Sequence, residues 1–190
     1  MRPSEVMRLF QGCGAWLEGH FVLSSGLHSR EYLQCALILE HPTLASRLCA
    51  ALAERFIGDE ITCVIGPALG GILVSYEMAR HLGARSLFAE RVDGRLQLRR
   101  GFRVGSADRI LVVEDVVTTG GSAEELIELL KETGATIVGV GALIDRSSGW
   151  VSFDVKFHAL LSVDAKTFQP ADCPSCKEGI PLAKPGSLNL

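Results

Sequence analysis

The sequence lacks long hydrophobic runs: stretches such as 110–113 and 137–144 are far shorter than the roughly 20 apolar residues of a membrane-spanning helix. Residues 1–5 have no apolar segment of the kind found in a signal peptide. A formal net charge of -3 gives no overall positive field that would attract nucleic acid or an anionic membrane. We therefore expect a cytoplasmic protein that binds neither nucleic acid nor membrane.

The sequence also lacks a disulfide framework. Its cysteines are scattered, and the first four lie in apolar surroundings, which is typical of reduced, buried thiols. Cys173 and Cys176 form a Cys-x-x-Cys pair with the spacing of half a zinc site, but no second pair and no closely spaced histidines complete it in the sequence. The pair is therefore predicted to be two thiols in a tail, and His20 and His28 to cap or pack.

A chain of 190 residues fits one domain with a sizeable core. Residues 1–58 are mostly helical in pattern, with helices opening at Pro3 and Pro42 and a polar, glycine-marked segment between them that would form a small hood. Residues 59–165 are predicted to form an α/β core, and 166–190 an irregular tail rich in proline and glycine.

The core alternates short apolar strands with helices. Strands are expected at 61–65, 85–89, 109–113 and 136–144, which predicts a mostly parallel sheet covered by helices on both faces. A helix is predicted over 122–133, with Ser122 and Glu125 as a capping box and Gly134 as its stop.

The loop between the third of these strands and this helix carries the chemistry. Two carboxylates, Glu114 and Asp115, end the strand, and a turn rich in hydroxyls and glycine leads into the helix N-terminus. Free backbone N–H groups and the positive end of a helix dipole are the parts of a phosphate site. Adjacent carboxylates would repel a simple phosphate, so they indicate a ligand that also carries hydroxyls or a developing positive charge. The plainer alternative is an acidic strand end before a capped helix.

This pattern resembles the motif of the type I phosphoribosyltransferases, which bind 5-phosphoribosyl-1-pyrophosphate (PRPP), and no P-loop motif competes with it. The resemblance implies the fold of that family, with Glu114 and Asp115 as catalytic residues. It also implies that PRPP contacts the whole motif, namely Glu114, Asp115, Val116, Val117, Thr118, Thr119, Gly120, Gly121 and Ser122.

Three further segments, 19–32, 65–72 and 143–146, resemble the orotate phosphoribosyltransferases, which implies that Thr118 and Arg146 bind orotate. Arg146 has an independent argument, because a planar guanidinium matches the carboxylate that distinguishes orotate from uracil. The alternative is a surface arginine paired with Asp145.

The segment 91–103 departs from the family pattern. It has five arginines and one acidic residue in place of a loop with lysine and histidine, and Asp93-Gly94 predicts a hairpin tip. Either its arginines, Arg91 among them, bind the pyrophosphate of PRPP, or the hairpin is solvated and only Leu96 and Leu98 pack on the body. The pyrophosphate loop also lacks the usual lysine, since it reads Leu69-Gly70-Gly71.

As a whole, the resemblance implies transfer of ribose 5-phosphate from PRPP to orotate, giving orotidine 5'-monophosphate and pyrophosphate. It implies Mg²⁺ held through PRPP with no direct protein ligand, and a homodimer. The alternatives are a purine or uracil phosphoribosyltransferase and a non-catalytic regulator that senses PRPP or a nucleotide.

Overall fold

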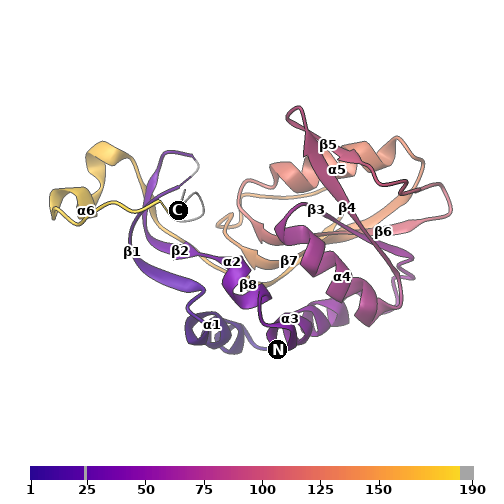
Figure 1. Ribbon diagram of the computed structural model, residues 1–190, viewed down its shortest axis with the longest axis horizontal. Helices are drawn as coiled ribbons and strands as arrows, with labels where there is room; N and C mark the ends of the chain where they lie inside the picture. The colour runs from indigo at the N-terminus through magenta and orange to yellow at the C-terminus, as the bar shows by residue number, and fades with distance from the viewer. Residues whose placement is uncertain (24, 185–190) are drawn as a thin grey trace.

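The computed structural model describes residues 1–23 and 25–184, and it contains two sheets (Figure 1). The larger sheet has the strand order β5-β4-β3-β6-β7-β8, and the smaller one the order β1-β2-β9. The strands of the large sheet are β3 (Cys63–Pro67), β4 (Arg85–Val92), β5 (Arg95–Leu98), β6 (Arg109–Val117), β7 (Thr136–Asp145) and β8 (Lys156–Ser162). Those of the small sheet are β1 (Trp16–Val22), β2 (His28–Leu33) and β9 (Thr167–Phe168).

Helices cover both faces of the large sheet, as the sequence predicted. The helices are α1 (Pro3–Gly12), α2 (Cys35–Leu39), α3 (Pro42–Ala53), α4 (Gly70–Leu82), α5 (Gly121–Lys131) and α6 (Pro174–Lys177), with short 3-10 turns η1 (Glu54–Phe56) and η2 (Pro170–Asp172). Alternate residues of a strand point to opposite faces. Leu111 and Val113 of β6 therefore join the core under α1–α4, whereas Ile110 and Val112 join the core under α5.

Strand pairing in the large sheet is parallel except at one edge. β3, β4, β6, β7 and β8 pair in parallel, and β5 is antiparallel to β4 because the two strands form the predicted hairpin with its tip at Asp93 and Gly94. Both tip residues have positive φ, 49° and 82°, as a tight turn requires. The carboxyl ends of the central strands β3, β6 and β7 thus meet at one edge of the sheet.

The N-terminal segment differs from the prediction. Residues 1–58 contain the expected helices α1 and α3, but the segment between them folds into the antiparallel hairpin β1–β2. We call β1, β2 and β9 together the hood. The glycine and the polar residues within β1 hide its strand character in the sequence, and the register shifts between Glu18 and Phe21. Ser24, in the connection between the two strands, lies outside the described residues.

The C-terminal segment is more regular than predicted. Residues 156–162 form the edge strand β8, and the expected irregular tail contributes β9, η2 and α6. The tail returns to the hood, where Ala183 bridges Phe21. The last six residues of the predicted tail, 185–190, lie outside the described residues. Among residues 1–23 and 25–184, no helix combines the length and apolar character needed to cross a membrane.

Candidate active site

The two adjacent carboxylates lie inside a strand rather than after it. β6 continues through Val117, with Glu114 paired to Ala142 and Val116 to Ile144 of β7. The expected strand end at Val113 was therefore wrong by four residues, because valine at 116 and 117 extends the ladder. Glu114 is only 9% exposed, and Asp115 is half-buried. Both carboxylates are thereby fixed at the carboxyl edge of the sheet.

Burial sets the charge state of this pair. Loss of water raises the pKa of Glu114 to about 8, with a further rise from the neighbouring Asp115 charge, while Arg91 opposes the shift. Burial also raises the pKa of Asp115, although the backbone N–H of Val116 donates a hydrogen bond to its carboxylate at 3.0 Å. Two such groups share their protons, so at neutral pH the ligand-free pair retains a proton mainly on Glu114.

Gly70 makes room for Asp115. A Cβ built on Gly70 would collide with the Asp115 carboxylate, so only glycine fits at this first residue of α4. The turn before it is equally tight, since a Cβ on Gly66 would collide with the carbonyl of Gly71. The sequence identified this loop only by resemblance and did not single out Gly70. Its signal was the pair of glycines that comes two residues after a buried strand.

The turn after β6 presents unobstructed backbone to solvent. Thr118 and Thr119 are exposed, and Gly120 directly precedes α5 with a φ of 78° and no side-chain cap. A Cβ at Gly120 would lie 2.8 Å from Val151, so this position requires glycine for space as well as for conformation. The N-terminus of α5 follows at once and adds the positive end of its dipole.

The predicted capping box of this helix is wrong. The residue before the helix is Gly120, and Glu125 instead accepts a hydrogen bond from the backbone N–H of Leu96 at 2.7 Å and pairs with Arg91 at 2.9 Å. Tertiary contact with the β4–β5 hairpin therefore overrides the local pattern. The plainer interpretation of the loop was an acidic strand end before a self-capped helix. The structure does not show the side-chain cap on which that interpretation depends.

Arg146 lies beside the same turn. Its backbone N–H donates to the carbonyl of Val117 at 2.8 Å, which places it next to Thr118 at the end of β7. The Nε atom of its half-buried guanidinium is buried and has no hydrogen-bond partner. Burial lowers the Arg146 pKa. Electrostatic interactions with Tyr32 and Glu31 of the hood oppose that decrease. No ion pair with Asp145 is found among the described residues, because Asp145 accepts hydrogen bonds from the Ser147 N–H and the Ser162 hydroxyl.

The arginine hairpin shows features of both interpretations. Leu96 is buried and Leu98 packs beside it, as the solvated-hairpin interpretation expects. Arg100 pairs with Glu90 at 2.7 Å and is exposed. Arg91, in contrast, bridges from the hairpin to Glu125 of α5 and influences the pKa of Glu114. Among the described residues, it is the hairpin arginine that lies within electrostatic reach of Glu114.

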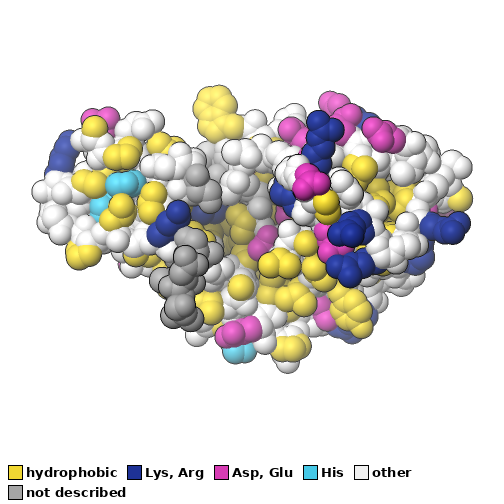
Figure 2. All heavy atoms as spheres, turned by 45° about the horizontal axis from the view of Figure 1, so that its top comes forward, with side chains coloured by type: hydrophobic (Ala, Val, Ile, Leu, Met, Phe, Trp, Pro, Cys, Tyr) yellow, Lys and Arg dark blue, Asp and Glu magenta, His cyan; other side chains and the backbone are white. Residues whose placement is uncertain are grey.

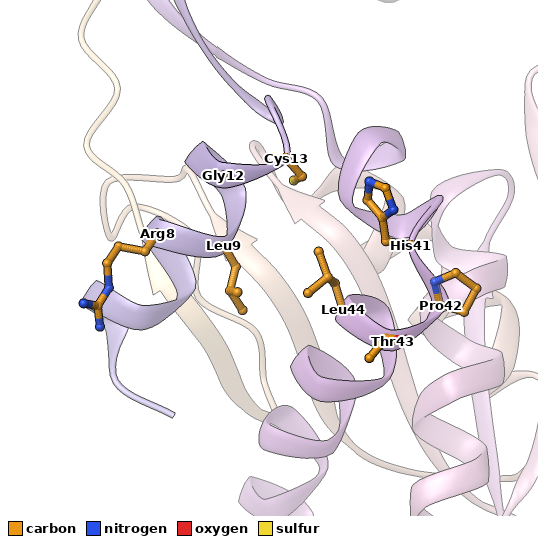
Figure 3. Close-up of a pocket in the computed structure, with 8 residues that line it drawn as sticks. All are labelled: Arg8, Leu9, Gly12, Cys13, His41, Pro42, Thr43 and Leu44. Carbon is orange, nitrogen blue, oxygen red and sulfur yellow. The ribbon is translucent and has the colours of Figure 1, made fainter.

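A pocket of about 460 Å³ lies elsewhere, between α1 and α3 (Figure 3). Leu9 and Leu44 face each other across it, and Arg8 points away. Its lining has no carboxylate and includes no residue of the β6–α5 turn. We therefore place the chemistry at the open carboxyl edge of the sheet, where the acidic pair, the phosphate-type turn and the buried guanidinium meet.

Comparison with known proteins agrees with this geometry. Residues 37–171 match the family model described as the phosphoribosyl transferase domain. The orotate phosphoribosyltransferase of Pelotomaculum thermopropionicum is 54% identical over 190 residues, which is all of both chains. That of Thermotoga maritima is 51% identical over 97% of this chain and 99% of its own.

A solved structure gives the same answer for the fold. The crystal structure of orotate phosphoribosyltransferase from Aeropyrum pernix superimposes with a TM-score of 0.73 and 28% identity, covering 83% of this chain and 93% of that one. The fold is thus that of the type I phosphoribosyltransferases, with a mostly parallel sheet flanked by helices. The chain belongs to the phosphoribosyltransferase family.

Proposed function

We propose that this protein is an orotate phosphoribosyltransferase, which transfers the ribose 5-phosphate of PRPP to orotate and releases pyrophosphate. Relatives about half identical over their full length carry that name. The single observation that carries the choice of orotate is the buried Nε of Arg146, which has no protein partner beside the phosphate-type turn. A buried guanidinium N–H without a partner is costly, and a ligand carboxylate would offset that cost.

The site residues divide the work by their chemistry. The turn from Thr118 to Ser122 would hold the 5-phosphate with backbone N–H groups, hydroxyls and the α5 dipole. Glu114 and Asp115 would accept hydrogen bonds from the ribose hydroxyls, which favours their ionised forms. As the bond to pyrophosphate breaks, the anomeric carbon gains positive charge, and the ionised pair would stabilise it electrostatically.

Orotate needs little activation at this site. It enters as an anion, so the nitrogen that attacks the anomeric carbon requires no strong general base. Arg146 and Thr118 would orient it, and the hydrogen bond from the Arg146 backbone N–H to the Val117 carbonyl supports a base-binding position close to the ribose. Tyr32 and Glu31 of the hood lie within electrostatic range of Arg146, so the hood would form the opposite wall of the orotate site.

Mg²⁺ fits this site as a companion of PRPP. Two carboxyls with raised pKa values are poor direct ligands before substrate arrives, and Mg²⁺ retains most of its water in such sites. The ion would therefore bind the pyrophosphate and ribose oxygens, with Glu114 and Asp115 acting through hydroxyls or water. When bound, it neutralises charge on the leaving group.

Arg91 would complete the pyrophosphate end of the site. Its ion pair with Glu125 is partly exposed, with side chains 46% and 34% accessible, so exchanging that carboxylate for a phosphate is inexpensive. The hairpin that carries it would then close over the leaving group and exclude water, which otherwise competes for the ribosyl cation.

A homodimer is also part of the proposal. Leu69, Leu73 and Tyr76 form an apolar stripe at helical spacing along α4, with exposures of 84%, 49% and 63%. Large apolar side chains in a row are typical of a surface that another chain covers. We infer a cytoplasmic location from the thiols of Cys35, Cys49 and Cys63, which are buried and unpaired with one another.

The test is production of orotidine 5'-monophosphate and pyrophosphate from PRPP and Mg²⁺ with orotate, compared with uracil and adenine. We expect turnover with orotate alone. Preference for another base would support a purine or uracil enzyme, and PRPP binding without turnover would indicate a regulator. In the Asp115→Asn variant, kcat/KM should fall more than about tenfold, or roughly 1.4 kcal/mol. A smaller loss contradicts the role of that carboxylate.

A further inference from the structure

Two histidines of the hood and the Cys-x-x-Cys pair of the tail meet in one cluster. His20 lies in β1, His28 opens β2, Cys173 directly precedes α6, and Cys176 lies within α6. One ligand atom from each lies within 4.8 Å of those of the other three. The sequence could not reveal this, because the histidines precede the cysteines by more than 140 residues.

From this cluster we propose a structural zinc site with two histidine and two cysteine ligands, independent of the proposed catalytic function. The distances are those of one tetrahedron. His20 Nε2 lies 3.0 Å from His28 Nδ1, and three of the four sulfur–nitrogen distances are 3.3, 3.4 and 3.6 Å. Zinc bonds of about 2.0 Å to nitrogen and 2.3 Å to sulfur give tetrahedral edges of about 3.3 to 3.8 Å.

The surroundings of His20 support ligation. Its Nδ1 lies 2.8 Å from the carbonyl of Ile180, so Nδ1 carries the proton and donates it there. The other ring nitrogen, Nε2, is then left with a lone pair directed at His28 and the two sulfurs. A backbone acceptor that fixes the tautomer in this way is the usual outer partner of a metal-bound histidine.

A hydrogen-bonded cluster without metal explains the geometry less well. Thiols are weak donors, and Cys173 is 1% exposed, so its contact with an imidazole stabilises little. His20 and His28 are also buried, at 4% and 6% exposure, and direct ring nitrogens at each other. One divalent cation would satisfy both lone pairs and both thiolates together.

A metal ion that joins the tail to the hood would also stabilise the hood. β9 contributes only two residues to its sheet. The other contacts between hood and tail include the Phe21–Ala183 bridge and Arg30, which contacts Ser175 and Glu178. The Arg30–Glu178 pair is half-exposed, which limits its contribution. Small units with little core commonly depend on a metal for their stability.

The ligand set selects zinc and a structural role. Tetrahedral sites with two sulfurs and two nitrogens hold zinc or iron–sulfur clusters. In a two-iron cluster the cysteines and histidines bind different irons, which would separate the sulfurs from the nitrogens beyond the observed 3.3 to 3.6 Å. Four protein ligands leave no open position for substrate, as in structural sites.

The figures place this site away from the proposed chemistry. Figure 1 shows α6, β1 and β2 at the opposite end of the molecule from α5. Figure 2 shows histidine at that end beside side chains of the hydrophobic class, which includes cysteine. Cys176 is exposed, so one of the four proposed ligands is accessible to solvent.

The test is the zinc content of the full chain, purified without chelators from medium supplemented with zinc. We expect one zinc ion per chain in the unaltered protein and in Cys13→Ser, a control thiol outside the cluster. The zinc content per chain of the double variant C173S/C176S should be at least about tenfold lower than that of the unaltered protein. His28→Cys keeps a set of four zinc ligands and should retain its zinc.

A second measurement avoids dependence on variants that fold poorly. Titrating the thiols of the unaltered protein with an organomercurial beside a zinc indicator should release the zinc as the two thiolates are blocked. Cobalt in place of zinc should show the visible bands of tetrahedral coordination. Zinc content in the unaltered protein no higher than in the double variant, or a Cys173–Cys176 disulfide in zinc-free protein, would overturn the proposal.

Discussion

Glu114 makes the stability of the ligand-free protein depend on pH, and glutamine at this position should remove its contribution to that dependence. In the folded protein this carboxyl has a pKa of about 8, against an ordinary value of 4.5. The folded state therefore holds the proton more tightly than the unfolded state, so ionisation favours unfolding. The destabilisation is absent below pH 4.5, grows as the pH rises, and is complete above pH 8.

The size of the effect follows from the two pKa values. At about 1.4 kcal/mol per tenfold change in proton affinity, the destabilisation is at most about 3 kcal/mol at pH 7 and about 5 kcal/mol above pH 8. Glutamine has nearly the same shape and is neutral at every pH. Glu114→Gln should therefore keep the packing of β6 and become more stable than the unaltered protein as the pH rises.

The assay is urea unfolding of both proteins, without ligand, from about pH 6 to about pH 8. The control is Glu125→Gln. The backbone N–H of Leu96 and then Arg91 lower the pKa of Glu125, so its stabilisation is complete above its ordinary pKa of 4.5. The stability difference for this control should stay constant across the window. A constant difference for Glu114→Gln as well would refute the reasoning.

Three further predictions concern the site and the surface. Arg146→Lys keeps the charge but loses the planar fork, so KM for orotate should rise roughly ten- to a hundredfold while KM for PRPP changes little; equal changes in both would contradict its role. Gly70→Ala forces a methyl group against Asp115, so kcat/KM should fall at least about tenfold, whereas Gly12→Ala, whose Cβ meets nothing within 4 Å, should be neutral in the same assay. Leu73→Glu on the α4 stripe should halve the mass measured by light scattering. Ile57→Glu, an exposed control outside α4, should leave the mass unchanged. An unchanged mass for Leu73→Glu argues against this dimer face.

The sequence predicted the core well because its signals there are local. The apolar strands, the glycine turn at Gly120 and the hairpin tip at Asp93 each depend on neighbours in the chain, and the structure confirms them. The capping box failed for the opposite reason. Glu125 has the right spacing from Ser122, but its carboxylate is engaged by Leu96 and Arg91 from another element.

The hood shows the same limit more strongly. β1 pairs with β2 across a register shift, and the tail that completes the sheet is distant in sequence. His20 and His28 were predicted to cap or pack because nothing near them in the sequence supplies further ligands. For the acidic pair, the sequence indicated position and chemistry, whereas the raised pKa values come from burial that only the folded chain reveals.

The joining of hood and tail also fixes an order of events during protein synthesis. His20 contacts the carbonyl of Ile180 across 160 residues, so the first strand made must wait for nearly the last residues. The α/β core can assemble while the ribosome still holds the tail, because its strands and helices follow one another in the chain. The β1–β2 hairpin emerges early and stays incomplete until β9 and the segment around Ile180 have also emerged. A nascent chain stalled before Cys173 would therefore have a folded core and an unfinished hood. His20 and His28 would be present, but the two cysteines of the proposed zinc site would not yet have been made.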